Sequence, residues 1–198
     1  MAVSGHDTGA TAPAKRLRRA ERREQILAAA TEAFARAGFA ATGLDDVAAE
    51  AGITRVILYR HFESKNELYR AVLDRARERF AEAIGDGHRY SEAGLAGMVG
   101  WAERDPAGFR LLFQHAAREP EFRHEIDDLR AEMVAAAYRD LTRGSAREPL
   151  AVWTSHLAPA LAVEAIMAWL DAGKPEPERA AERIGRALEG FFGALESD

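Results

Sequence analysis

Residues 44–62, LDDVAAEAGITRVILYRHF, decide the fold of this chain. The spacing of their apolar side chains predicts a short amphipathic helix that ends at Gly52, and Thr54 is a suitable N-cap for a second short helix. Only Ile53 links the two. Two helices joined by a tight turn with a glycine and a buried aliphatic residue form a helix-turn-helix, a motif that lays its second helix in the major groove of DNA.

The second of these helices is intrinsically weak. Val56 and Ile57 are β-branched, the helix spans about two turns, and isolated helices shorter than about 12–15 residues barely form in water. Packing must therefore hold it, and we expect Leu58 and Phe62 to point inward. A simple helical corner without any DNA contact is the alternative interpretation. The side chains left to point outward are Thr54, Arg55, Val56, Tyr59, Arg60 and His61.

Proline and glycine divide the rest of the chain into helix-length pieces, and no stretch shows the sustained alternation typical of strands. The sequence therefore predicts an all-α protein of about nine helices. We expect a disordered tail over residues 1–14, an N-terminal helix-turn-helix domain over 15–63, and a larger C-terminal helical domain over 64–198. The predicted helices cover residues 17–37, 44–51, 54–61, 64–84 and 150–172. Two others are capped by Ser91 and Asp105, one buries Phe122 to Leu141, and a last one carries Ile184 to Leu195.

The composition excludes several classes of protein. Hydrophobic residues make up 47% and charged residues 30% of the 198 residues, which is typical of a globular chain and too apolar for a disordered one. The absence of cysteine excludes disulfides, thiolate zinc sites and iron–sulfur clusters. No apolar run approaches the roughly 20 residues that span a bilayer, and no signal-peptide core begins the chain, so we expect a cytoplasmic protein without a membrane partner.

The formal net charge of −5 hides a basic N-terminal end on an acidic body. Between Lys15 and Arg23, six basic residues stand against Glu21 alone. This arrangement indicates a polyanionic partner for that end of the chain only. A solvated basic tail without a partner is the alternative.

We find no set of residues in the sequence suited to catalysis or to metal binding. Glu121 and His124 form one Glu-x-x-His motif, but a di-iron site in a helical bundle requires a second copy and two further glutamates. Ser155 and His156 are adjacent, so on a helix their side chains diverge by about 100° and cannot act as a nucleophile and its base. We expect no enzyme activity and no cofactor.

Further motifs surround the helix-turn-helix between residues 22 and 75. They are Phe34 with Gly38-Phe39, Thr42, Val47-Ala48, Ala51-Gly52-Ile53-Thr54, Leu58-Tyr59-Arg60-His61-Phe62 and Ser64-Lys65. Together they resemble the DNA-binding domain of the tetracycline-repressor (TetR) family. The remainder of the chain is similar to the family only in its length and its layout of helices. The sequence departs from the family's pattern at Gly43, where a second Ser or Thr is usual, and at Val56, where Gly, Pro or Lys is common.

The resemblance implies a role for each matching residue. Arg55 is the residue able to bond a guanine bidentately, which gives about 1–3 kcal/mol of discrimination against other bases. Thr54 and Val56 would meet base edges beside it, and the basic segment 15–23 would lie near the DNA backbone or the minor groove. The implied phosphate contacts are Thr42, Tyr59, His61 and Lys65.

The resemblance also implies a homodimer. One helix-turn-helix reads too few base pairs to be selective, and two copies read a near-palindromic operator in double-stranded DNA. The last two apolar helices would form a four-helix bundle with the partner's pair; burial of these helices against each other within a monomer is the alternative. The expected interface residues are Leu157, Leu161, Ile184, Leu188, Phe191, Phe192 and Leu195.

In the family the C-terminal domain binds a small molecule, which implies a repressor that a small hydrophobic effector releases from its operator. Large aromatic side chains on separate helices are candidates for the pocket, and plain core packing is the alternative for each. An activator or a regulator without an effector fits the same residues, as does a helical module that binds small molecules or proteins and whose basic N-terminus is incidental. The candidate ligand-binding residues are Trp101, Phe109, Phe113, Trp153 and His156.

Overall fold

The computed structural model describes residues 19–85, 91–143 and 148–196, and every regular element within these ranges is helical. The predicted all-α class is therefore confirmed. The tail expected over residues 1–14 lies outside the described residues, as do Lys15, Arg16 and Arg18. The helices are α1 (Arg19–Ala41), α2 (Leu44–Glu50), α3 (Arg55–Tyr59), α4 (Lys65–Ile84), α5 (Glu92–Arg104), α6 (Pro106–Arg110), α7 (Arg123–Arg143), α8 (Glu148–Asp171) and α9 (Ala180–Glu196), with the short turns η1 (Leu111–His115), η2 (Ala116–Arg118) and η3 (Pro177–Arg179).

Three helices begin at the N-caps that the sequence predicts. Ser64, Ser91 and Asp105 each accept, through the side chain, a hydrogen bond from the backbone N–H three residues further on. In α6 the cap is followed by Pro106, which lacks the N–H that the first helical position leaves unpaired. Apolar spacing predicts an ordinary helix after Phe109, but the chain widens there into the π-helical turn η1, which such spacing does not distinguish from an α-helix.

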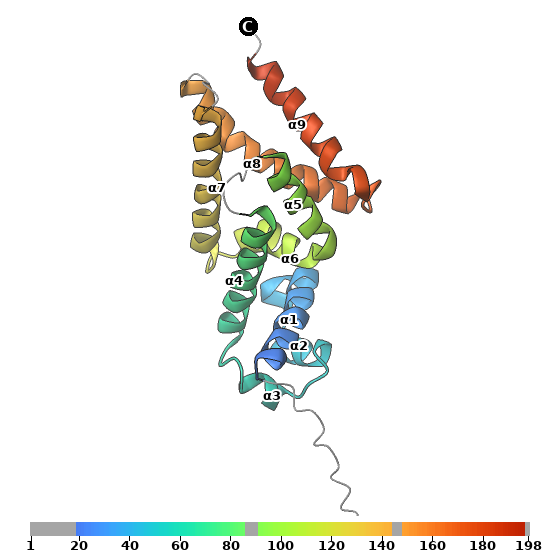
Figure 1. Ribbon diagram of the computed structural model, residues 1–198. Helices are drawn as coiled ribbons and strands as arrows, with labels where there is room; N and C mark the ends of the chain where they lie inside the picture. Colours follow the sequence, from blue (N-terminus) through green and yellow to red (C-terminus); the bar gives the residue numbers. More distant parts are fainter. Residues whose placement is uncertain (1–18, 86–90, 144–147, 197–198) are drawn as a thin grey trace, which may run out of the picture.

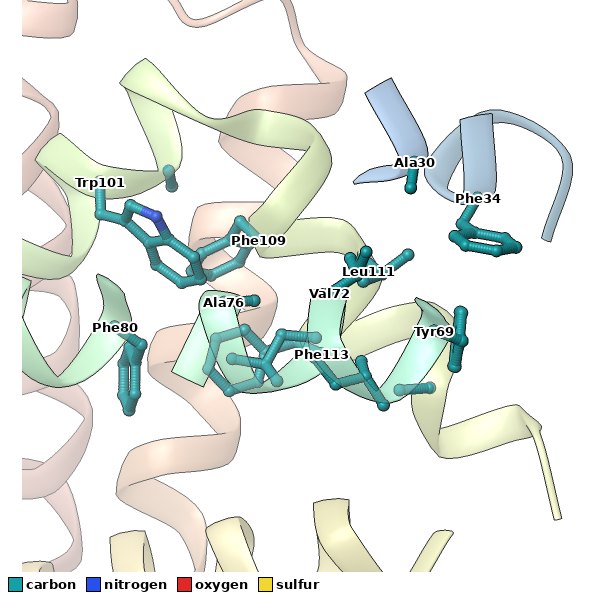
Figure 2. Packing of buried hydrophobic residues seen from close by; sticks show 14 of the residues in the cluster. Ala30, Phe34, Tyr69, Val72, Ala76, Phe80, Trp101, Phe109, Leu111 and Phe113 are labelled. Carbon is teal, nitrogen blue, oxygen red and sulfur yellow. The ribbon is translucent and has the colours of Figure 1, made fainter. Parts of the chain in front are cut away.

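The molecule is elongated, with α1–α3 at one end and α9 at the other (Figure 1). Helix α4 runs between these ends and carries a continuous core along one side. Near the start of α4, Tyr69 meets Phe34 of α1 edge-on, with ring centroids 4.9 Å apart. Further along α4, Phe80 meets Phe113 of η1 at 5.4 Å (Figure 2). The same core therefore joins α1–α3 to the helices that follow.

Helix α5 approaches the end of α4 so closely that a side chain would not fit between their backbones. A Cβ placed on Gly97 would lie 1.8 Å from the carbonyl oxygen of Ala83. Real Cβ atoms do not come this close to backbone oxygens, and the backbone cannot move aside as a flexible side chain can. Packing between the two helices thus requires glycine at position 97.

The apolar helix α8 packs along α7 and α9. By length and composition its segment Pro149–Asp171 is able to cross a membrane, contrary to the expectation that no apolar run is long enough. The core helices of soluble proteins have the same composition, and 39% of the most apolar window of this segment is buried inside the structure. Its exposed part includes Val152 and Trp153, which no neighbouring helix among the described residues covers.

Candidate nucleic-acid interface

The turn between α2 and α3 is built around Gly52. Its φ of +62° lies in the left-handed region, which glycine adopts without the steric cost that a Cβ imposes. The Ile53 N–H donates to the carbonyl of Ala48 at 2.9 Å, and the Gln25 side chain of α1 donates to the carbonyl of Ala51 at 2.7 Å. These hydrogen bonds fix the direction in which α3 leaves the turn.

Helix α3 has only five residues and depends on packing for its stability. Leu58 and, just beyond the helix, Phe62 are buried as predicted. On the opposite side Val56 is 63% and Tyr59 is 42% exposed. The helix lies at the end of the molecule away from α9 (Figure 1). It therefore presents large side chains to solvent on a protruding part of the surface.

Arg55 is held at this surface by two neighbours. Its Nη1 donates to the Asp45 carboxylate of α2 at 2.9 Å, and its Nη2 donates to the Tyr59 hydroxyl at 3.2 Å. The hydrogen bond to Tyr59, and after it the charge of Asp45, raise the pKa of Arg55 above its usual range. Beside it, Thr54 is exposed and its hydroxyl makes no capping hydrogen bond to α3. A charged and pre-positioned guanidinium is suited to a guanine edge or a phosphate.

Lys65 begins α4 close to the end of α1. Its ammonium donates to the carbonyl of Ala40 at 3.3 Å and lies 4.3 Å from the ring centroid of Phe39. An ammonium has three hydrogens, so this carbonyl leaves donors for a further acceptor. The position at a helix N-terminus adds backbone N–H groups that favour an anion. Lys65 is thus placed to hold a phosphate.

His61 lies half-buried beside α1. Burial is the main cause that lowers the pKa of its imidazole, and the charges of Arg19, Arg22 and Arg23 lower it further. Among the described residues, no carboxylate pairs with Arg19 or Arg23. The cluster of cations favours the neutral imidazole in the free protein and attracts an anion to this edge of the surface.

The structure corrects the prediction for Thr42. This residue is 2% exposed, and its hydroxyl lies 2.7 Å from the carbonyl oxygen of Gly38 and 3.2 Å from that of Ala33. The hydroxyl therefore stabilises the kinked end of α1 and does not face a phosphate. Helix α2 is capped without it, because the Gly43 N–H donates to the Asp46 side chain at 2.7 Å.

The structure places the five predicted ligand-binding residues in its core and on its outer surface. Trp101, Phe109 and Phe113 are buried and pack against one another, with ring centroids 4.8–6.5 Å apart. They belong to the core shown in Figure 2, which was the alternative for each of them. Trp153 and His156 are exposed on α8. None of the five lines the cavity between α4 and α9 in the described part of the chain. Helical spacing alone does not reveal which face of a helix borders a void.

This cavity has a volume of about 490 Å³ and opens between α4, α5, α7, α8 and α9. Its wall is mostly apolar, with side chains such as Leu95, Met98 and Met133. Thr154 is 5% exposed and lines the same wall, and no hydrogen bond to its hydroxyl is found among the described residues. Sequence reasoning missed Thr154 because a threonine within an apolar run has no distinguishing signal.

The predicted interface residues divide between this cavity and the outer surface. Leu188 and Phe192 line the cavity. On the outside, Phe191 is 43% and Trp153 is 53% exposed. One of these exposed aromatic side chains lies on α8 and the other on α9, the two helices predicted to form the interface. The other predicted interface residues, Leu157, Leu161, Ile184 and Leu195, are half-buried.

Comparison with known proteins bears directly on the surface around α3. The family model of bacterial regulatory proteins of the tetR family matches residues 26–72, which contain α2, α3 and most of α1. The crystal structure of a TetR-like transcriptional regulator from Rhodococcus sp. RHA1 is similar with a TM-score of 0.74 and 26% identity, covering 92% of this chain and 100% of that one. The chain belongs to the TetR family. This is a family of transcriptional regulators and not of enzymes.

Relatives of this TetR-family chain carry different regulatory names. The chain is 33% identical over 141 residues to the HTH-type transcriptional activator FasR of Mycolicibacterium smegmatis, a match that covers 67% of this chain and 64% of FasR. It is 41% identical over 58 residues to the HTH-type transcriptional repressor BepR of Brucella suis, covering 29% of this chain and 28% of BepR. The matched region thus spans less than two thirds of either relative.

Proposed function

We propose that this chain is a sequence-specific DNA-binding transcriptional regulator of the bacterial cytoplasm, whose helix α3 enters the major groove. One observation carries the proposal: a helix too short to persist alone is packed through Leu58 and presents Arg55, Val56 and Tyr59 to solvent. Exposed aromatic and cationic groups on such a helix contribute little to folding and are suited to a nucleic acid. The family membership of the chain supports the same function.

The exposed residues divide into base and phosphate contacts. Arg55 donates to the O6 and N7 atoms of a guanine, Thr54 offers its hydroxyl, and Val56 offers only methyl contact to a thymine. Lys65 and His61 lie beside α3 and bind the phosphate backbone, and Tyr59 adds its hydroxyl. Base contacts set the sequence that is bound, whereas phosphate contacts add affinity for any sequence.

The regulator acts as a homodimer on a near-palindromic operator. One α3 contacts too few base pairs for selectivity, and two copies enter major grooves about 34–36 Å apart, or a multiple of that distance. The apolar surface of α8 and α9, which includes Trp153 and Phe191, supplies the contact between the copies. Exposed apolar patches of this kind mark interaction sites on proteins.

A small, largely apolar effector occupies the cavity between α4 and α9. Its volume of about 490 Å³ lies in the usual range for small-molecule sites. The hydroxyl of Thr154, which has no hydrogen-bond partner in the described part of the chain, offers one polar contact. An effector releases the DNA when it binds more tightly to a conformation in which the two α3 helices no longer match the grooves. The loss in free energy of DNA binding cannot exceed the difference between the effector's binding free energies for the two conformations. The apolar fluorescent probe N-phenyl-1-naphthylamine should bind the full chain, and Ala158→Phe, which fills the cavity, should abolish the signal without unfolding the protein.

The sign of regulation that we propose is repression. A dimer bound over a promoter blocks polymerase with its DNA contacts alone, whereas activation needs an additional surface for polymerase. The relative FasR, by contrast, is named as a transcriptional activator. Transcription in vitro from a promoter that contains the bound site should fall when the protein is added; a rise in transcript would assign an activator.

Selection from a library of randomised DNA duplexes tests the DNA-binding function. We expect the full chain to enrich a sequence with two-fold symmetry, and its affinity for that duplex to fall steeply between 50 mM and 200 mM salt, because phosphate contacts release counterions. No enriched sequence, or binding that salt does not weaken, would contradict the proposal.

A further inference from the structure

Helix α2 begins with two aspartates that have different partners. Asp46 accepts a hydrogen bond from the backbone N–H of Gly43 at 2.7 Å and so caps its own helix. Asp45 makes no such contact and reaches across to α3, where its Oδ2 lies 2.9 Å from Nη1 of Arg55. The second carboxylate therefore belongs to the recognition surface.

Protein stability does not explain the placement of Asp45. Both members of its ion pair with Arg55 are exposed, and exposed pairs of this kind contribute little to folding. On a surface that meets DNA, the carboxylate also repels the phosphate backbone. Asp45 therefore lowers the affinity of α3 for DNA of any sequence, unless a base contact that only one sequence provides offsets the repulsion.

We propose that Asp45 is a specificity-determining residue that acts through Arg55. This inference rests on the proposed DNA-binding function. With Nη1 bonded to Asp45 and Nη2 to Tyr59, the guanidinium is kept from turning toward any nearby phosphate. A guanine in the bound site offers two acceptors that offset the repulsion of the carboxylate. Random DNA offers no such acceptors in register, so the repulsion there is not offset.

The same helix supplies a matched control. Glu50 pairs with Arg36 of α1 at 2.9 Å in an exposed ion pair that includes no residue of α3. Asp45→Asn and Glu50→Gln therefore remove the same charge from α2 and break one exposed ion pair each. Only the first substitution releases Arg55.

The test compares affinities for two duplexes, one selected by the wild-type chain from a randomised library and one scrambled to the same base composition. Asp45→Asn should bind the scrambled duplex more tightly, and the ratio of the two affinities should fall by about threefold or more, the size of effect seen when one exposed ion pair is lost. Glu50→Gln should change both affinities by the same factor. In an Arg55→Ala background, Asp45→Asn should leave the ratio unchanged.

An unchanged ratio in Asp45→Asn, or an equal fall in Glu50→Gln, would overturn the inference. A fall that persists in the Arg55→Ala background would also overturn it, because Asp45 would then act without Arg55. Failure of the wild-type chain to select any sequence would instead overturn the proposed function. Thermal unfolding of each variant checks that it is folded, and Asp45→Ser replaces Asp45→Asn if the latter melts early.

Discussion

The carboxylate of Glu24 on α1 lies 2.6 Å from the guanidinium of Arg75 on α4. Arg79, one turn further along α4, reaches the same carboxylate at 2.9 Å and reaches Asp105, the N-cap of α6, at 3.1 Å. This series of ion pairs joins α1, through α4, to the beginning of α6. It ties α1 to α4, whose C-terminal end lines the cavity.

Substitution of Glu24 by glutamine should destabilise the protein, because the Arg75 side chain is 11% exposed and loses its carboxylate partner. We expect the free energy of unfolding to fall by about 1–2 kcal/mol. Glu50→Gln breaks the exposed pair with Arg36 and should cost about 0.5 kcal/mol or less. Urea denaturation measures both values; equal costs would show that Arg75 does not depend on Glu24.

Gly97→Ala should disrupt the contact between α4 and α5, since the new Cβ would meet the Ala83 carbonyl oxygen. The expected loss of stability is about 3 kcal/mol or more. Gly190 on α9 has no atom within 4 Å of a Cβ placed on it, so Gly190→Ala should instead stabilise by about 0.5–1 kcal/mol. Thermal unfolding distinguishes the two variants, and a Gly97→Ala protein that melts with the wild type would refute the close approach.

DNA affinity should rise as the pH falls from about 7.5 to 5.5, a range centred near the usual pKa of histidine. Burial and the nearby arginines lower the pKa of His61 in the free protein. A phosphate beside it would raise this pKa in the complex, so binding takes up a proton and is favoured by acid.

His61→Gln should remove this pH dependence, whereas His124→Gln on α7 should keep the wild-type slope. Because the pKa of His61 is lowered in the folded state, the free protein also loses stability as the pH falls below the usual range. Circular dichroism at each pH therefore defines the range in which affinity is measured. If the DNA affinity of the wild type does not change with pH, or if His61→Gln shows the same pH dependence as the wild type, His61 does not contact a phosphate.

Phe191→Asp should produce a monomer, because it places a charge on the apolar surface of α8 and α9. Light scattering should give twice 21.7 kDa for the wild type and a single chain for the variant. Affinity for the selected duplex should fall by about a hundredfold, since the second α3 no longer binds from the same molecule. Ala131→Asp, at an exposed site on α7, should stay dimeric. A monomeric wild type would contradict the proposed interface.

The helix-turn-helix could be predicted because local chemistry specifies it. The positive φ at position 52 favours glycine, Thr54 immediately precedes α3, and Ser64 caps α4. The sequence alone therefore locates the motif to within about two residues. The inward direction of Leu58 and Phe62 follows from the spacing of apolar residues. Each of these signals acts over a few residues of chain.

Features that depend on packing between distant helices could not be predicted. Aromatic residues such as Trp101 and Phe109 show the same spacing whether they line a cavity or fill a core. Thr42 matches the family's pattern, but its hydroxyl is hydrogen-bonded to backbone carbonyls at the kinked end of α1. The ion pair between Asp45 and Arg55 depends on the angle between α2 and α3, which cannot be read from the sequence.

The most direct test of the account measures the affinity of the wild type, Arg55→Ala and Lys65→Ala for the selected and scrambled duplexes over a range of salt concentrations. Arg55→Ala should reduce the difference in binding free energy between the two duplexes by about 1–3 kcal/mol. Lys65→Ala should weaken both by the same factor and reduce the salt slope by about one. Equal losses on both duplexes for Arg55→Ala would contradict the claim that α3 reads the sequence of DNA.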